Sequence, residues 1–155
     1  MRFSTVIFTS ILLLSSLISQ GQDKDSLYMR EHYDKFEYHI PMRDGAKLFT
    51  LVYMPKDRSR TSPILMNRTC YNASNYGNFK TYGHPSDFLV KDGYILVFQD
   101  VRGRYMSDGL FNNMTPNIPG NDPKNRTAID ESSDTWDSID WMVNNLKGNN
   151  GRAGI

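Results

Sequence analysis

The run YILVFQ at residues 94–99 is short and apolar, and it follows directly on Gly93. Short apolar runs bounded by turn residues are typical of β-strands that are covered on both faces of a sheet. A second such run, SPILMNRT, stands at 62–69, and SDFLVK at 86–91 predicts a short helix between them, capped by Ser86 and ended at Gly93. This strand–helix–strand order predicts two parallel strands in an α/β sheet.

An antiparallel hairpin is predicted ahead of these strands. The sequence YDKFEYHIP at 33–41 alternates apolar and polar residues, which is the period of a half-buried strand. The turn residues RDG follow at 43–45, and KLFTLVYM at 47–54 returns as the second strand. The fold class is therefore α/β, with an antiparallel leading hairpin followed by parallel strands and helices.

A long helix and a further strand come last in the sequence. Apolar side chains recur at helical spacing between residues 130 and 147, at Trp136, Ile139, Val143 and Leu146. The small residues GRAGI at 151–155 predict the start of another buried strand. A sheet that stopped here would leave one face uncovered and one edge open, so we expect this chain to be the N-terminal part of a longer protein.

The segment 100–126 shows little periodicity and is rich in Asn, Gly and Pro. It predicts a long excursion over the surface between the strand at 94–99 and the last helix. Loops of this length in a compact domain are usually functional or disordered.

The N-terminus has the pattern of a secretory signal. A basic start is followed by a mostly apolar stretch at 6–18 and by small residues at 19–21. A membrane-spanning helix needs about 20 predominantly apolar residues, and this stretch is shorter and interrupted by Ser and Thr. We expect a signal peptide at 1–21, a loose polar lead-in at 22–32 and a folded region at 33–155 that is secreted or periplasmic, without a stable membrane span after cleavage. A retained anchor is the alternative.

Composition excludes several classes of partner. The formal net charge is +1, from 18 basic and 17 acidic residues, and the basic residues are scattered, so no nucleic-acid partner is predicted. Cys70 is the only cysteine, which excludes an internal disulfide and a multi-cysteine zinc site. We interpret it as a buried thiol. No cofactor and no metal site are predicted, and a homo-oligomer is left open.

The sequence contains no G-x-S-x-G motif, which carries the nucleophile of many serine hydrolases with α/β sheets. The nearest match, Ser107 in GRYMSDG, has Tyr105 where that motif needs glycine, and it resembles an ordinary turn. The histidines, His32, His39 and His84, precede the position that the order Ser, Asp or Glu, His requires. None of these residues is assigned a catalytic role.

Acidic residues gather at the start of the predicted last helix: Asp130, Glu131, Asp134, Asp137 and Asp140. They could suggest a metal site, but no His or Cys completes a ligand set. Acidic residues near a helix N-terminus favour the helix dipole and usually face solvent. We therefore expect a solvated acidic face.

Tyr71 follows directly on the predicted strand 62–69, at the carboxyl end, where open α/β sheets place their ligands. A phenol there can donate a hydrogen bond to a developing oxyanion. From spacing alone, a tyrosine that only packs against its neighbours is the more common alternative.

Four segments in succession resemble one family: IPMRDGAKLFTLVYMPK (40–56), PILMNRTCYNASNYG (63–77), GYILVFQDVRGRYMSDGLF (93–111) and DESSDTWDSIDWMVNNLKGNNGRAGI (130–155). They are similar to the acyl hydrolases of the Xaa-Pro dipeptidyl-peptidase (S15) and CocE/NonD family, and nearest within it to α-amino acid ester hydrolases, which are relatives of cocaine esterase and glutaryl-cephalosporin acylases. The resemblance covers nearly all of the chain after the predicted signal.

The resemblance implies an α/β-hydrolase domain with a Ser-His-Asp triad, acting on small-molecule esters or amides such as α-amino acid esters or β-lactam side chains. The strand at 151–155 would run into the nucleophile elbow, and all three triad residues would lie beyond residue 155. Tyr71 would donate its hydroxyl to the oxyanion hole. The chain has Cys70 and Tyr105 where relatives commonly have Pro and Gly, while Asp100 and Arg102 are interpreted as structural.

Two alternatives remain open. Within the family, the protein could be a proline-directed dipeptidyl-peptidase. From another class, the missing nucleophile is compatible with a secreted, non-catalytic binding module. By either enzymatic interpretation, we expect residues 1–155 alone to be inactive because they contain neither a nucleophile nor a correctly ordered base.

Overall fold

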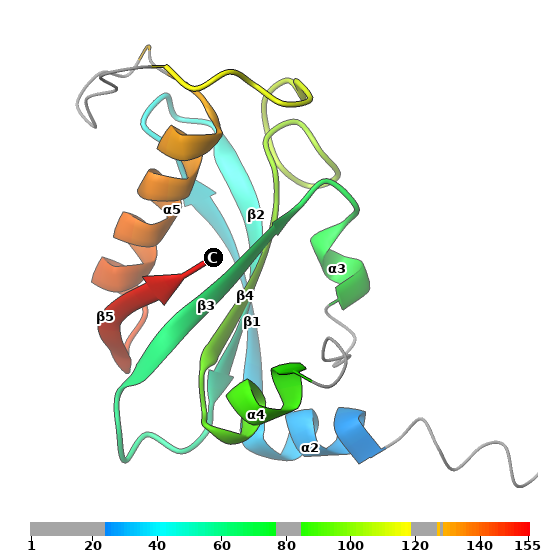
Figure 1. Ribbon diagram of the computed structural model, residues 1–155, viewed down its shortest axis with the longest axis vertical. Helices are drawn as coiled ribbons and strands as arrows, with labels where there is room; N and C mark the ends of the chain where they lie inside the picture. The colour runs from blue at the N-terminus through cyan, green and yellow to red at the C-terminus, as the bar shows by residue number, and fades with distance from the viewer. Residues whose placement is uncertain (1–23, 77–84, 119–126, 128) are drawn as a thin grey trace, which may run out of the picture.

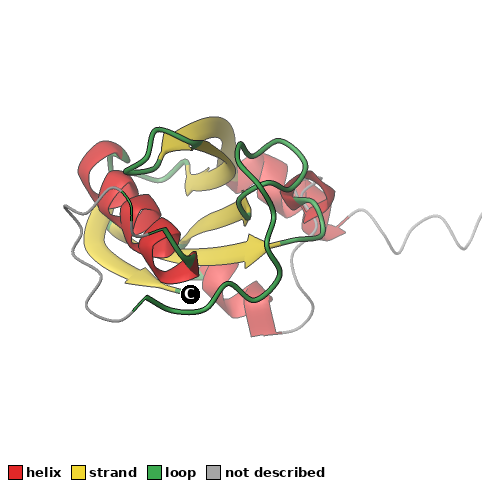
Figure 2. Cartoon of the chain, turned by 90° about the horizontal axis from the view of Figure 1, so that it is seen from above, coloured by secondary structure: helices red, strands yellow, loops and turns green. Residues whose placement is uncertain are grey.

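The computed structural model of the chain describes residues 24–76, 85–118, 127 and 129–155. The predicted signal peptide at 1–21 and His84 lie outside these residues. The described chain forms one mixed five-stranded sheet in the order β1-β2-β4-β3-β5 (Figure 1). Helices lie on both of its faces (Figure 2). The predicted α/β fold class is confirmed.

The predicted hairpin is confirmed. Strands β1 (Tyr33–Pro41) and β2 (Lys47–Pro55) pair antiparallel over their whole length. The turn between them closes with hydrogen bonds from Met42 N to Ala46 O (2.7 Å) and from Gly45 N to Met42 O (2.9 Å). Strand β1 is the outer strand of the hairpin and half-exposed, whereas β2 is buried after its first residue.

The predicted parallel centre is also confirmed. Strands β3 (Ser62–Thr69) and β4 (Ile95–Asp100) pair in parallel, and β4 also pairs antiparallel with β2. Helix α4 (Pro85–Lys91) precedes β4 as predicted and is followed by Gly93, which has a φ of 72° and donates to Val90 O. Glycine adopts this left-handed conformation without a steric cost. The helix begins at Pro85, one residue before the predicted Ser86 cap.

The side chains of each strand alternate between two cores. Even-numbered residues of β2 and β3 and odd-numbered residues of β4 face α5 (Glu131–Asn145). This core contains Leu48, Val52, Met54, Ile64, Met66, Ile95, Val97, Met142 and Leu146. The alternate residues face α2 (Lys24–His32), the one-turn helix α3 (Ala73–Tyr76) and α4. This core contains Met29, Tyr33, Phe49, Leu51, Tyr53, Ala73, Val90, Leu96 and Phe98.

Several local predictions are wrong. Residues 24–32 form the helix α2 rather than a loose lead-in, and α2 places Met29 in the core with 2% of its surface exposed. Trp136, predicted on the apolar face of the last helix, is 49% exposed, because the buried side of the first turns of α5 is polar. Cys70 is half-buried rather than buried.

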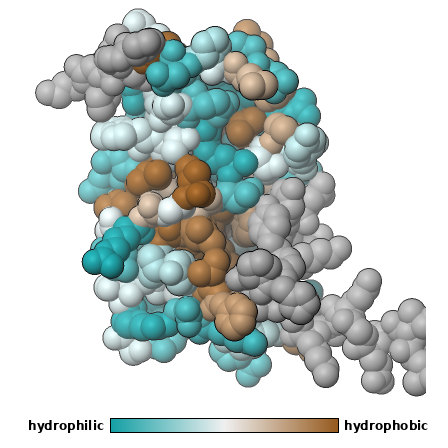
Figure 3. All heavy atoms as spheres, viewed as in Figure 1, coloured by the Kyte–Doolittle hydropathy of each residue, from teal (hydrophilic) through white to brown (hydrophobic). Residues whose placement is uncertain are grey.

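Strand β5 (Asn149–Gly154) forms as predicted, parallel to β3, but its side chains are exposed rather than buried because it is the edge strand of the described sheet. On the face of the molecule shown in Figure 3, apolar side chains form a band from the end of β5 across β3 to α4. Ile155 after β5 and Phe88 on α4 are 68% and 73% exposed.

Candidate active site

Tyr71 stands at the carboxyl end of the central parallel strands. The ladder between β3 and β4 ends with the pair Thr69 and Asp100, and Tyr71 follows two residues later. Its side chain is 71% exposed, whereas its backbone N–H donates to Thr69 Oγ1 at 3.0 Å. The fold therefore presents the phenol to solvent from a fixed backbone at the edge where α/β sheets place their ligands.

Asp100 ties the loops after β3 and β4 together. Its carboxylate is fully buried and accepts hydrogen bonds from Ala73 N (2.6 Å) and Met106 N (3.4 Å). Its carbonyl accepts from the Ser107 hydroxyl at 2.7 Å. The structural interpretation of Asp100 is confirmed, because this side chain satisfies backbone donors in the segment after Tyr71 and in the loop after β4.

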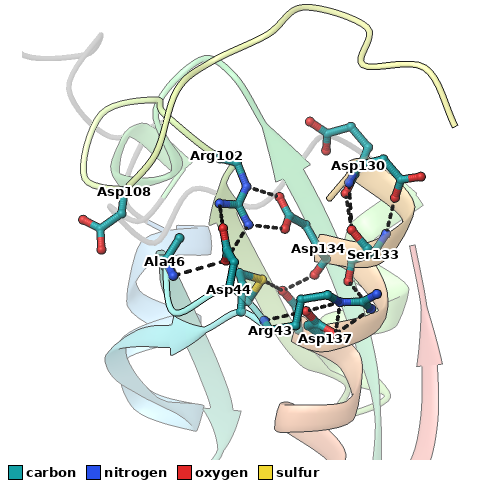
Figure 4. A network of polar contacts seen from close by, with 12 residues as sticks. Arg43, Asp44, Ala46, Arg102, Asp108, Asp130, Ser133, Asp134 and Asp137 are labelled. Carbon is teal, nitrogen blue, oxygen red and sulfur yellow. Dashed lines mark hydrogen bonds and ion pairs between the residues drawn. The ribbon is translucent and has the colours of Figure 1, made fainter. Parts of the chain in front are cut away.

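Arg102 has the predicted structural role as well, in a polar network beside the start of α5 (Figure 4). Its guanidinium contacts the Asp134 carboxylate at 2.7 and 3.0 Å and the Asp44 carboxylate at 2.8 and 3.2 Å. Burial by itself lowers the pKa of Arg102, but the hydrogen bonds and charges of both carboxylates raise it above its ordinary value. The arginine thus joins the hairpin turn, the loop after β4 and α5.

Two other arginines face the same end of α5. Arg43 binds Asp137 through two guanidinium nitrogens, at 2.8 and 3.0 Å. Arg68, from β3, donates to the Glu131 carboxylate at 2.6 Å and to the carbonyl of the same residue at 3.0 Å. The hydrogen bond to Asp137 raises the pKa of the Arg43 guanidinium although burial lowers it.

The prediction of a solvated acidic face is therefore wrong for most of these residues. Asp130 and Asp134 are 3% and 2% exposed, and the Asp137 side chain is 9% exposed. Asp130 caps α5 by accepting from Ser133 N at 2.7 Å. Only Asp140 is fully on the solvent side, since the helix turns it away from the sheet. Acidic spacing alone could not reveal this, because the arginine partners lie on three separate segments.

The other candidates have no catalytic arrangement in the described chain. The Ser107 hydroxyl accepts from Phe49 N at 2.9 Å as well as donating to Asp100 O, so it is a structural turn residue. His32 stacks on Tyr28, and His39 lies beside Phe49. Among the described residues, no group of three or more His, Cys, Asp or Glu side chains is arranged to hold a metal ion.

Within the described residues, no helix is both long enough and apolar enough to cross a membrane.

A mixed sheet with a parallel centre, covered by helices on both faces, matches the fold of solved hydrolases and places the chain in the α/β-hydrolase class. The sequence matches the X-Pro dipeptidyl-peptidase (S15) family over residues 44–155, and the chain belongs to this family. The resemblance inferred from its sequence segments is confirmed. The members of this family are hydrolases.

Known relatives support the assignment. Cocaine esterase from Rhodococcus sp. (strain MB1 Bresler) is 30% identical over 118 residues, which are 75% of this chain and 18% of the esterase. An α-amino acid ester hydrolase, solved as a selenomethionine-labelled protein, has a TM-score of 0.65 and 41% identity over 79% of this chain and 20% of its own. An aminopeptidase from the marine sediment archaeon Thaumarchaeota archaeon has a TM-score of 0.66 and 38% identity with the same coverage.

The chain spans about a fifth of the length of these three relatives. The family match over residues 44–155 contains the strands from β2 to β5 and the Tyr71 segment.

Proposed function

We propose that this chain supplies the N-terminal part of an exported serine hydrolase that acts on small esters or amides. The observation that carries the proposal is the position of Tyr71: an exposed phenol on a fixed backbone at the carboxyl end of β3. In an acyl hydrolase, a hydrogen-bond donor at this place can stabilise the oxyanion of the tetrahedral intermediate.

The register of β5 supports a nucleophile close to Tyr71. Gly154 pairs with Leu65 of β3, and the two strands run parallel. Strand residues advance by about 3.3 Å each, so a chain that continued β5 would reach the level of Thr69 and Tyr71 within a few residues. A G-x-S-x-G elbow at that level would place its serine beside the phenol.

The proposed reaction uses groups from two parts of the protein. The serine of the elbow attacks the ester or amide carbonyl, and a histidine that is oriented by an aspartate takes its proton and later gives it to the leaving group. The Tyr71 hydroxyl, together with a backbone N–H after the serine, donates to the oxyanion. The three triad residues are expected beyond residue 155.

A Tyr71→Phe substitution in the full-length protein tests the role of Tyr71. Removing one oxyanion donor lowers kcat by about 10² to 10³ in hydrolases of this kind. We expect a loss of this size with unchanged thermal unfolding. Tyr28→Phe, on α2 at the opposite end of the sheet, is the matched control (Figure 1). An unchanged kcat for Tyr71→Phe would remove Tyr71 from the mechanism.

The substrate class is proposed from the relatives. The α-amino acid ester hydrolase and cocaine esterase favour esters, whereas the family description and the aminopeptidase favour peptide amides. We place α-amino acid esters first, because the ester hydrolase shares 41% identity with this chain, and keep β-lactam side chains as a further candidate class from the sequence resemblance. A parallel assay of amino acid esters and dipeptide-proline amides on the full-length protein distinguishes these possibilities. Faster turnover of the proline amides would favour a dipeptidyl-peptidase.

Export and the need for residues beyond 155 have tests of their own. N-terminal sequencing of the protein recovered from outside the cytoplasm should begin near residue 22, and a protein that retains Met1 would argue against a cleaved signal. Purified 1–155 should not hydrolyse an activated ester. Turnover that a serine-directed inhibitor abolishes would contradict this expectation.

A further inference from the structure

Arg104 donates a hydrogen bond to the peptide group that joins Cys70 to Tyr71. Its Nε donates to the Cys70 carbonyl at 3.1 Å, and its guanidinium carbon lies 4.9 Å from the ring centroid of Phe111 and 5.3 Å from that of Tyr105. We propose that Arg104 is a positioning residue for Tyr71, which holds the phenol where it can donate to the oxyanion. This inference rests on the proposed function.

The contact fixes the peptide from which Tyr71 extends. The Cys70 carbonyl and the Tyr71 N–H belong to one planar unit. Arg104 holds the carbonyl side of this unit, and Thr69 Oγ1 accepts from the N–H side at 3.0 Å. Both hydrogen bonds together define the orientation of the plane and hence the direction of the Tyr71 Cα–Cβ bond. Cysteine at position 70 does not restrict its own φ as a proline would, so the orientation depends on these external contacts.

The loop that carries Arg104 is itself held in place. Arg104 N donates to Val101 O at 3.1 Å, and Ser107 N donates to Arg104 O at 2.9 Å. Asp108 exchanges hydrogen bonds with the backbone of Lys47, at 2.9 and 3.0 Å. The backbone of Arg104 is therefore held against the start of β2 and the end of β4. The position of its guanidinium depends on the two aromatic rings.

The rings of Tyr105 and Phe111 suit the planar guanidinium of Arg104 better than they would suit an ammonium group. Arg104 is half-buried, whereas Tyr105 and Phe111 are 56% and 39% exposed. A guanidinium can stack on aromatic faces and donate in its own plane at the same time, which an ammonium cannot do. The cation–π contacts thus orient Nε toward the Cys70 carbonyl.

A double-mutant cycle on the full-length enzyme tests the inference. We expect Arg104→Met to lower kcat by about 10- to 100-fold, because a displacement of a catalytic group by about 1 Å can lower the rate by about 10²-fold. KM should change less than kcat, since Arg104 does not contact the substrate. In the Tyr71→Phe background, Arg104→Met should cause no further loss, because the hydroxyl that it positions is already absent. Arg30→Met, exposed on α2, is the matched control.

The outcomes separate this inference from the proposed function. If Tyr71→Phe lowers kcat but Arg104→Met does not, the positioning role is wrong and the oxyanion role stands. If Arg104→Met lowers kcat equally in both backgrounds, it acts by another route, and the inference is overturned. If Tyr71→Phe has no effect, the proposed role of Tyr71 fails and the positioning role fails with it. Phe111→Leu, which removes one ring, should cause a smaller loss with the same dependence on Tyr71, and this variant replaces Arg104→Met if the latter does not fold.

Discussion

The Arg43 guanidinium and the Asp137 carboxylate form a two-pronged ion pair that joins the hairpin turn to α5 across 94 positions of the sequence. The side chains are 6% and 9% exposed, and Asp137 also accepts from Arg43 N at 2.9 Å. The pair therefore anchors the long helix over the sheet in its first turns, where the buried residues Ser133, Asp134 and Ser138 are polar.

Asp137→Ala should lower the free energy of unfolding by about 3 to 5 kcal/mol, because it removes the carboxylate that pairs with the buried Arg43 guanidinium. Asp140→Ala, the same change on the exposed side of the same helix, should stay within about 0.5 kcal/mol of the parent. Urea-induced unfolding of both variants provides the comparison. Equal effects would show that the ion pair does not anchor the helix.

Gln99→Leu should lower the free energy of unfolding by about 3 kcal/mol. The Gln99 side chain is fully buried, accepts from Arg68 Nε at 3.0 Å and donates to Thr50 Oγ1 at 2.9 Å. Leucine removes the acceptor of the Arg68 Nε–H and one hydrogen bond of the Thr50 hydroxyl in the core. The double variant Gln99→Leu, Arg68→Met should recover part of the loss, since the Nε donor that has lost its acceptor is then absent. No recovery would mean that the loss has another origin.

Gly103→Ala should disrupt the loop after β4. A Cβ at Gly103 would lie 2.1 Å from Phe111 N, which is backbone and cannot move alone. Gly45→Ala is the matched control, since Gly45 also has a positive φ, of 91°, but has nothing within 4 Å of its added Cβ. We expect about 1 to 2 kcal/mol for Gly45→Ala from backbone strain alone and a larger loss for Gly103→Ala. A thermal unfolding comparison in which the control is affected as strongly would contradict the close approach.

Stability should fall in acid partly through Asp44. Burial by itself raises the pKa of the Asp44 carboxyl, but the hydrogen bonds from Arg102 and Ala46 and the charge of Arg102 lower it below its ordinary value. Because the pKa in the folded state is depressed, the contribution is present above the ordinary value of about 3.9 and is lost as the pH falls through the folded-state pKa. The difference in Tm between the parent and Asp44→Asn should therefore shrink below about pH 4. A difference that is independent of pH would exclude this ion pair as the cause.

The strands and the long helix were predictable because each has a local signal. The run at 62–69 has the same bounds as β3, and the runs at 94–99 and 47–54 correspond to β4 and β2 within one residue. Apolar runs bounded by turn residues predict strands because any neighbouring strand or helix can cover their apolar side chains. Helix α2 was missed because its sequence has no apolar periodicity, and its Met29 is buried only because the sheet lies beside it.

The candidate site was predicted in part. The position of Tyr71 after β3 follows from strand order alone, and the structural interpretation of Asp100 and Arg102 follows from their place at the end of β4 and just after it. The partners of these residues did not follow, since Ala73, Asp44 and Asp134 lie 27 to 58 positions away along the chain.

By itself, the sequence determined the five strands, the helices α4 and α5 and the placement of Tyr71 at a strand end, since apolar periodicity and turn chemistry act between near neighbours. Only the tertiary structure decided that the acidic start of α5 is buried and that Arg104 lies behind the Tyr71 peptide. These features depend on which distant charges the folded sheet brings within hydrogen-bond range, and no local pattern encodes that distance.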